Sequence, residues 1–290
     1  MKNYLSIILT LLVSSSYALE AGSGFVESTS KVSVAATNIV LNGKKVVKYE
    51  FTVKNNSVFR LHSFDIGTVN GVEACLLDFA SKPLFEQGAF FQSPNSWLGE
   101  TFTNDFALNR TCLVWTLDDK ADNAKAIAPG TSKSGFVFYS PRKIGGLIGT
   151  YVTLDSDYQT QKYQVTKVTK SDLIAPTGTV SPQVAKAPLK PNTPVSYTIK
   201  AAITAKDNID PIPDIEFVSL SKATSTGNAT TSPFGASEYT ILGSNAAGKY
   251  ADQFSIVAGA TPVKYKLVYK IVDASDNAAL ISTDITIPQK

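Results

Sequence analysis

Short runs in which apolar and polar residues alternate one by one dominate this chain of 290 residues. Between Val46 and Val53, one face carries Lys48, Glu50 and Thr52, and the other carries Val47, Tyr49, Phe51 and Val53. Residues 195–203 and 263–271 repeat the same pattern. A period of two predicts strands with one buried face, and no long stretch shows the period of an amphipathic helix. The chain is therefore expected to be all-β.

Turn and breaker residues divide these runs into two groups. Pro129-Gly130 is a turn signal within the first group, and several prolines follow a boundary at about Lys170 to Thr177. The length suffices for two domains that each bury a core. Short strands separated by turns at this spacing predict β-sandwiches. We expect an N-terminal β-sandwich domain at 19–172 and a C-terminal one at 175–290.

The N-terminus has the three parts of a secretory signal peptide. Lys2 provides positive charge, Leu5 to Val13 is apolar, and small residues lead to Ala18. The apolar run is shorter than the ~20 residues that a membrane-spanning helix needs. We expect residues 1–18 to be cleaved, the alternative being a buried N-terminal strand. Nothing later resembles a transmembrane segment, so a secreted or extracytoplasmic location is expected, in the periplasm or at the cell surface.

The two cysteines, Cys75 and Cys112, both lie in strand-like segments of the first domain. An exported compartment permits disulfides, so a bridge between the two is expected. Two separate buried thiols are the alternative.

Two acidic, turn-forming corners follow strands of the second domain. Their oxygen-bearing side chains are Asp207, Asn208, Asp210 and Asp214 in one corner, and Asp273, Asp276 and Asn277 in the other. Calcium takes six to eight oxygen ligands of these types, although the spacing does not match an EF-hand. The corners are thus a candidate calcium site. The alternative is that Asp and Asn bond their own backbone and serve as turn residues.

The same two corners carry a resemblance to a known group of modules. The segments Asp207-Asn208-Ile209-Asp210-Pro211 and Tyr269 to Ala279 resemble bacterial secreted immunoglobulin-like, hyalin-repeat or fibronectin type III-like modules. Asp276 stands where those modules have glycine. The resemblance covers residues 175–290 and implies architecture rather than activity. The expected fold class is therefore all-β, with two immunoglobulin-like β-sandwich domains after a cleaved signal peptide.

An aromatic-rich stretch between Phe85 and Phe106 is the second candidate site. It is punctuated by Gly, Pro, Asn and Ser, and its candidate ligand-binding residues are Phe90, Phe91, Trp97 and Phe102. Exposed aromatic faces stack on sugar rings or anchor a protein partner. The alternative is a loop that folds over the sandwich and buries its own aromatics.

The parts of the common catalytic sites are missing from the sequence. His62 is the only histidine, and no Gly-x-Ser-x-Gly elbow, zinc-protease motif or phosphate loop occurs. No catalytic residue is assigned. A nucleic-acid partner usually requires a strongly basic surface stripe. The small net charge of +3 gives no electrostatic case for one, so nucleic acid is not expected as a partner.

The leading hypothesis is a secreted or cell-surface, non-catalytic binding or adhesion protein. Its N-terminal sandwich binds a cell-surface or matrix glycan or protein, and its C-terminal sandwich is a spacer. One alternative is a secreted polysaccharide hydrolase that uses two carboxylates. Another is a structural subunit of a surface assembly.

Overall fold

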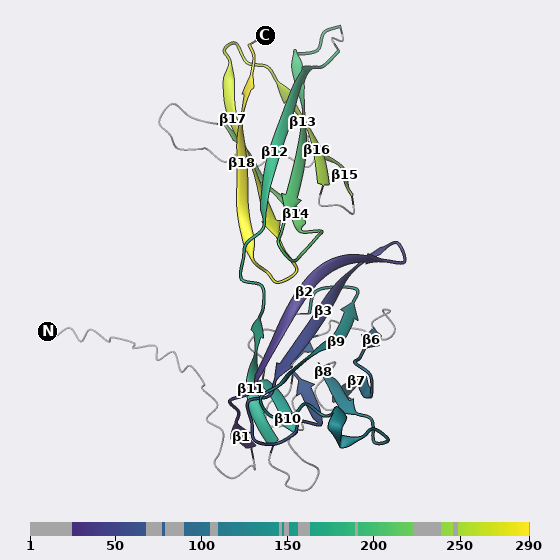
Figure 1. The fold of residues 1–290 in the computed structure, drawn as a ribbon. Helices are drawn as coiled ribbons and strands as arrows, with labels where there is room; N and C mark the ends of the chain where they lie inside the picture. The colour runs from purple at the N-terminus through teal and green to yellow at the C-terminus, as the bar shows by residue number, and fades with distance from the viewer. Residues whose placement is uncertain are drawn as a thin grey trace, which may run out of the picture.

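The structure is a computed structural model, and two β-rich parts are stacked end to end in it (Figure 1). It describes residues 25–67, 77–78, 90–104, 110–144, 147, 151–155, 163–188, 191–222, 239–245 and 249–289. The expected signal peptide, residues 1–18, lies outside this description. We call β1–β11 the N-terminal sheet and β12–β18 the C-terminal sandwich.

The strands of the N-terminal sheet form one continuous hydrogen-bonded array of 11 strands. Its order is β5-β8-β4-β10-β11-β2-β3-β9-β6, with β1 beside β11 and β7 beside β8. The strands are β1 Phe25–Glu27, β2 Lys31–Leu41, β3 Lys44–Lys54, β4 Ser63–Ile66, β5 Leu77–Asp78, β6 Phe90–Gln92, β7 Trp97–Asn104, β8 Arg110–Leu117, β9 Ser132–Ser140, β10 Tyr151–Asp155 and β11 Tyr163–Lys170. A short 3-10 helix, η2 (Asn123–Lys125), precedes β9.

Strand β11 connects the two halves of this array because it changes partners along its length. Its first part, from Tyr163 to Lys167, pairs antiparallel with β10, whereas Val168 to Lys170 pairs parallel with β2. The sheet therefore curls around one hydrophobic core to which strands from both halves contribute.

The core of the N-terminal sheet is aromatic. Trp115 is fully buried, stacks on Phe64 with ring centroids 5.2 Å apart, and meets Phe51 at 5.3 Å. The predicted inward face of β3 is confirmed, since Val47, Tyr49, Phe51 and Val53 are all buried. Burying a large apolar side chain of this kind stabilises a fold by about 1.5–3 kcal/mol.

A two-residue turn joins β2 to β3. Asn42 and Gly43 take φ angles of 50° and 76°. Positive φ at both central residues is typical of the type I′ turn, whose twist matches that of the adjoining strands. The resulting long hairpin extends toward the C-terminal sandwich (Figure 1).

The C-terminal sandwich consists of a 4-stranded sheet, β12-β13-β16-β15, and a 3-stranded sheet, β14-β17-β18. The strands are β12 Thr177–Lys186, β13 Ser196–Lys206, β14 Asp214–Lys222, β15 Tyr239–Asn245, β16 Lys249–Val257, β17 Val263–Val272 and β18 Ala278–Ile287. Alternating residues of β13 and β17 are buried as predicted, and they form a second core that includes Ile199, Phe254 and Tyr269. The described chain is thus all-β in both parts.

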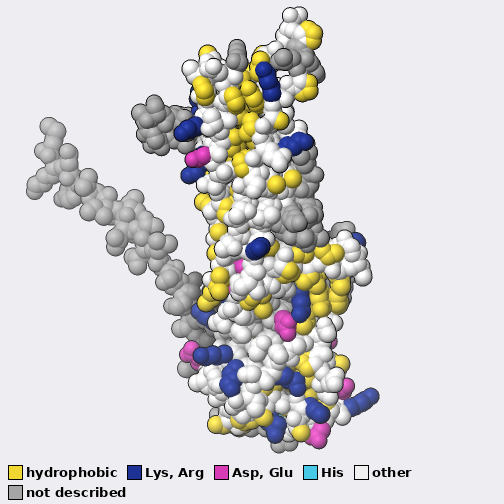
Figure 2. Space-filling model, turned by 45° about the horizontal axis from the view of Figure 1, so that its top comes forward, with side chains coloured by type: hydrophobic (Ala, Val, Ile, Leu, Met, Phe, Trp, Pro, Cys, Tyr) yellow, Lys and Arg dark blue, Asp and Glu magenta, His cyan; other side chains and the backbone are white. Residues whose placement is uncertain are grey.

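Charged side chains of both signs are scattered over the face of the molecule that Figure 2 presents, and no continuous basic stripe crosses it. This distribution agrees with the small net charge of +3.

Candidate functional site

The two acidic corners both lie where the C-terminal sandwich meets the N-terminal sheet. One corner is the loop between β13 and β14, and the other is the loop between β17 and β18. Ala274 of the second loop is 4% exposed and belongs to the core of the N-terminal sheet. The corners therefore form the junction between the two parts of the molecule.

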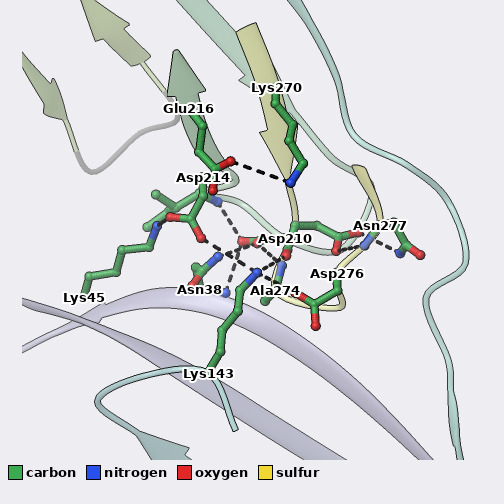
Figure 3. Close-up of polar contacts among 12 residues, drawn as sticks. Asn38, Lys45, Lys143, Asp210, Asp214, Glu216, Lys270, Ala274, Asp276 and Asn277 are labelled. Carbon is green, nitrogen blue, oxygen red and sulfur yellow. Dashed lines mark hydrogen bonds and ion pairs between the residues drawn. The ribbon is translucent and has the colours of Figure 1, made fainter. Parts of the chain in front are cut away.

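Asp210 is the central polar residue of this junction and is fully buried. Its Oδ1 accepts hydrogen bonds from the backbone N–H of Asn38 at 3.1 Å and of Ile212 at 3.0 Å. Its Oδ2 accepts from Asn38 Nδ2 at 2.7 Å and from the backbone N–H of Ala274 at 2.8 Å (Figure 3). Four donors from three chain segments thus surround the predicted calcium ligand Asp210, and protein groups occupy its oxygens.

Two lysines of the N-terminal part, Lys45 on β3 and Lys143 after β9, meet the remaining acids of the corners. Lys45 pairs with Asp214, and Lys143 Nζ lies 3.0 Å from Asp276 Oδ1 and 3.9 Å from Asp214 Oδ2 (Figure 3). Lys143 also donates to the backbone oxygen of Asp273 at 2.7 Å. We call these contacts, together with those of Asp210, the junction latch. Asp214 and Asp276 therefore bind cationic side chains in the structure.

A small cleft of about 230 Å³ lies beside the latch. Its polar lining includes Asn38, Lys45, Arg142, Lys143 and Asp214. The volume falls below the roughly 300–1,000 Å³ that is typical of small-molecule sites. We assign no ligand to it.

A second group of carboxylates lies in the same region but has a different environment. One side-chain oxygen from each of Asp172, Asp207 and Asp273 lies within 4.8 Å of the others. Asp172 is 1% exposed and Asp273 is fully buried, whereas Asp207 is partly buried. We call these three residues the carboxylate triad.

In two of the three triad side chains, one carboxylate oxygen has no hydrogen bond. Asp207 Oδ1 accepts from the backbone N–H of Ile209 and Asp210, and Asp172 Oδ1 accepts from that of Ile174. The Oδ2 atoms of Asp172 and Asp207 are buried and have no hydrogen-bond partner. Buried polar atoms in native proteins are nearly always bonded, so these two oxygens call for an explanation.

The pKa of Asp273 reflects its burial among these carboxylates. Burial raises the pKa of its carboxyl above the ordinary value, and the hydrogen bonds from Asn277 lower it. The neighbouring carboxylates of Asp172 and Asp207 raise the pKa further. Asn277 Nδ2 donates to Asp273 Oδ2 at 2.8 Å and to the backbone oxygen of Asp172 at 3.1 Å, and so holds the linker against the second corner.

The predicted calcium ligands are therefore divided between the latch and the triad. Asp207 and Asp273 lie in the triad, while Asp210, Asp214 and Asp276 lie in the latch. Asn208 is exposed. The sequence gives no sign of Asp172 as a ligand, because it is the last residue of the expected N-terminal domain and lies outside both acidic corners.

Asp276 takes a left-handed backbone conformation, with a φ of 62°. This is the conformation that a glycine supplies most readily, and Asp is one of the few other residues that tolerate it. The tight turn between β17 and β18 is thus formed with Asp276 at its left-handed position.

The aromatic stretch forms strands β6 and β7 in the part of the chain that the structure describes. Trp97 is 4% exposed, and its Nε1 donates to the backbone oxygen of Lys125 at 3.2 Å. Phe91 packs on Trp115 above Gly99, where an added Cβ would lie 2.7 Å from the Phe91 ring. This burial removes Trp97 and most of Phe91 from the binding surface that the sequence suggested. The backbone of Phe102 pairs with Cys112, and its side chain lies outside the described residues.

Phe90 differs from its neighbours because it is 40% exposed. Its ring stacks on Tyr139 of β9 with centroids 4.3 Å apart and an interplanar angle of 16°. The Tyr139 hydroxyl donates to Gln92 Oε1 at 3.1 Å. An aromatic pair with a polar neighbour thus spans β6 and the adjacent strand β9, with Phe90 exposed.

Cys112 is 2% exposed on β8, while Cys75 lies outside the described residues, so the expected disulfide stays a prediction. His62 is 8% exposed, and its Nε2 lies 2.7 Å from Asn123 Oδ1 of η2.

Comparison with protein-family models gives no match, and comparison with curated proteins gives none either. Within the described part of the chain, no helix combines the length and hydrophobicity needed to cross a membrane.

Proposed function

We propose that this chain is a secreted or cell-surface binding protein of bacterial type, in which the N-terminal sheet binds a glycan or protein without catalysis. The C-terminal sandwich holds that binding part away from its point of attachment. The signal-like segment 1–18 supports export. A Cys75–Cys112 disulfide belongs to the same proposal, with a stabilisation of roughly 3–4 kcal/mol, and non-reducing peptide mass spectrometry tests it.

We further propose that the C-terminal sandwich is an immunoglobulin-like module. Its strand order supports this, since β12-β13-β16-β15 and β14-β17-β18 correspond to the ABED and CFG sheets of the constant-type immunoglobulin fold. Modules of this fold host many functions, so the strand order alone assigns no activity. The latch contacts favour a spacer role because they restrain its orientation relative to the N-terminal sheet.

The Phe90–Tyr139 pair, in which Phe90 is exposed and Tyr139 is partly buried, carries the binding proposal. The strand register places Phe90, Tyr139 and Lys48 in one row across β6, β9 and β3. Lys48 forms an ion pair with Glu50 at 2.7 Å on the same face. A flat aromatic surface bordered by amide, amino and carboxylate groups suits a sugar ring or the side chains of a protein partner.

A glycan and matrix-protein array, followed by titration of any ligand found, tests the proposal. Phe90→Ala and Tyr139→Ala should each weaken binding about tenfold, because a stacked aromatic contact contributes on the order of 1 kcal/mol or more. Phe59→Ala is the matched control, since Phe59 is a 43% exposed aromatic residue in the loop between β3 and β4. The absence of binding at tens of micromolar in the wild type, or equal losses in all three variants, contradicts the proposal.

A different group of acids favours the hydrolase as a second candidate. The pKa of Asp65 is raised to about 7, chiefly by burial and in smaller part by the carboxylates of Asp155 and Glu100. The strand register places Asp65, Val114 and Glu100 in one row across β4, β8 and β7. Neighbouring strands are about 4.8 Å apart, so the two acids are separated by roughly the spacing that an inverting glycosidase needs.

Assays on a panel of polysaccharides distinguish the two candidates. A hydrolase should lose at least about a hundredfold in rate on substitution of Asp65→Asn or Glu100→Gln, because each carboxyl has a separate role in the reaction. A binding protein should release no reducing sugar and should bind equally well in both variants.

A further inference from the structure

The geometry of the carboxylate triad fits a single cation. Calcium–oxygen distances are about 2.4 Å, so two oxygens bound to the same ion are at most about 4.8 Å apart. One oxygen from each of Asp172, Asp207 and Asp273 lies within 4.8 Å of the other two. The three residues come from the linker after β11, the loop after β13 and the loop after β17.

The unpartnered oxygens provide independent evidence for a ligand. Asp172 is 1% exposed, and both its Oδ2 and that of Asp207 are buried without a hydrogen-bond partner. The Oδ1 atoms of both residues are already held by backbone N–H groups. Since a buried carboxylate oxygen without a partner is costly, a positive ion between the side chains accounts for what the protein itself leaves unsatisfied.

We propose that Asp172, Asp207 and Asp273 bind one Ca²⁺ ion, which ties the linker to both corner loops of the C-terminal sandwich. All three ligands are carboxylates, and oxygen donors select hard cations such as Ca²⁺ and Mg²⁺ over zinc and copper. Irregular loops suit Ca²⁺ better, because Mg²⁺ demands near-ideal octahedral geometry.

The ion would act on the junction through the residues that it orders. Asp207 Oδ1 accepts from the backbone N–H of Asp210, the central residue of the latch, at 2.7 Å. The backbone oxygen of Asp273 accepts from Lys143 of the N-terminal part. Calcium binding at the triad therefore fixes both loops that carry the latch. This role of calcium goes beyond the proposed ligand-binding function and does not depend on it.

Isothermal titration of the full chain with CaCl₂, in the absence of any other ligand, tests the site. We expect one ion per chain with a dissociation constant on the order of 10⁻⁴ M, as in other extracellular modules. Asp172→Asn should weaken binding at least about tenfold, because it removes one of only three charged ligands. The matched control Asp214→Asn changes a latch acid of the same region outside the triad, and should keep the wild-type affinity within about twofold.

Thermal unfolding gives a second measurement, and circular dichroism checks that each variant is folded. Calcium should raise the midpoint of the wild type and of Asp214→Asn, but leave that of Asp172→Asn nearly unchanged. The absence of both heat and a midpoint shift at about 10 mM Ca²⁺ would overturn the proposal, because extracellular sites saturate below that concentration. Equal loss of binding in Asp172→Asn and Asp214→Asn, or equal affinity for Mg²⁺, would overturn it as well.

Discussion

The latch acids and the triad acids lie at the same junction but have opposite environments. Asp210 has four hydrogen-bond donors from three segments, whereas Asp172 and Asp207 each keep a buried oxygen without a partner. The sequence around all of them is similarly acidic. The difference shows that the hydrogen bonding of a buried carboxylate depends on which donors the fold brings to it. The latch holds the junction together with protein groups alone, while the triad leaves a charge to be balanced.

The largest expected effect comes from removing the central latch acid. Asp210→Ala leaves Asn38 and the backbone N–H of Ala274 without their acceptor in a buried place, and should lower the free energy of unfolding by about 3 kcal/mol. Denaturant-induced unfolding of the full chain measures this. Asp214→Ala is the control, because its ion pairs are partly exposed and should contribute less than about 1 kcal/mol. Equal losses in the two variants would contradict the central role of Asp210.

Asp65 lies in a third kind of environment, which differs from those of the latch and the triad. It is partly buried beside other acids and has a folded-state pKa of about 7, above its value in the unfolded chain. Its contribution to stability is therefore fully present below about pH 4 and is lost as the pH rises through about 7. We expect the wild type to lose about 2 kcal/mol over this range beyond what Asp65→Asn loses. Unfolding at a series of pH values checks this, and parallel curves would refute it.

Without calcium, a substitution in the triad should change the free energy of unfolding in the opposite direction to a substitution in the latch. Asp172→Asn removes one of three like charges, and should raise the free energy of unfolding by about 1 kcal/mol in chelator. In calcium the same substitution should be destabilising, because the ion loses a ligand. Unfolding measured in both buffers checks the change of sign. A loss of stability in chelator would place Asp172 with the latch acids.

The smallest effect is expected at the turn between β17 and β18. Asp276→Gly removes the contact with Lys143, but relieves the cost of a left-handed conformation at φ 62°. These effects oppose each other, so the free energy of unfolding should change by less than about 0.5 kcal/mol. Asp276→Ala should be clearly less stable than Asp276→Gly, since it loses the contact and keeps the strain. Paired thermal melts of the two variants measure the difference.

The alternation of residues predicted the strands and their buried faces well, because a period of two places side chains on alternate faces of any strand. Residues 195–203 and 263–271 contain buried faces of β13 and β17 as expected. The curling of the N-terminal sheet was not predicted, since it depends on the change of partners along β11. The local alternation of apolar and polar residues does not indicate which distant strands pair.

The candidate site was predicted in part for a similar reason. The acidic corners were visible as local clusters, but their division between latch and triad depends on residues far away in the sequence. Asn38 carried a usable signal, because it is a polar residue at an inward position of β2 and pairs with Asp210. Trp97 and Phe91 were placed in a loop because glycine and proline surround them. Both instead lie in strands, with Trp97 buried and the Phe91 ring packed on Trp115 where Gly99 leaves room.

The pairing of β11 has a mechanical consequence when tension is applied along the linker that follows it. The C-terminal sandwich is joined to the N-terminal sheet through the linker that follows this strand, whose last residues run parallel to β2. A pull along the linker loads these hydrogen bonds in shear, so that they must rupture together rather than open one after another. The β1–β11 pairing is also parallel and shares the load. Strand β11 therefore makes the connection to the C-terminal sandwich resistant to tension along its length.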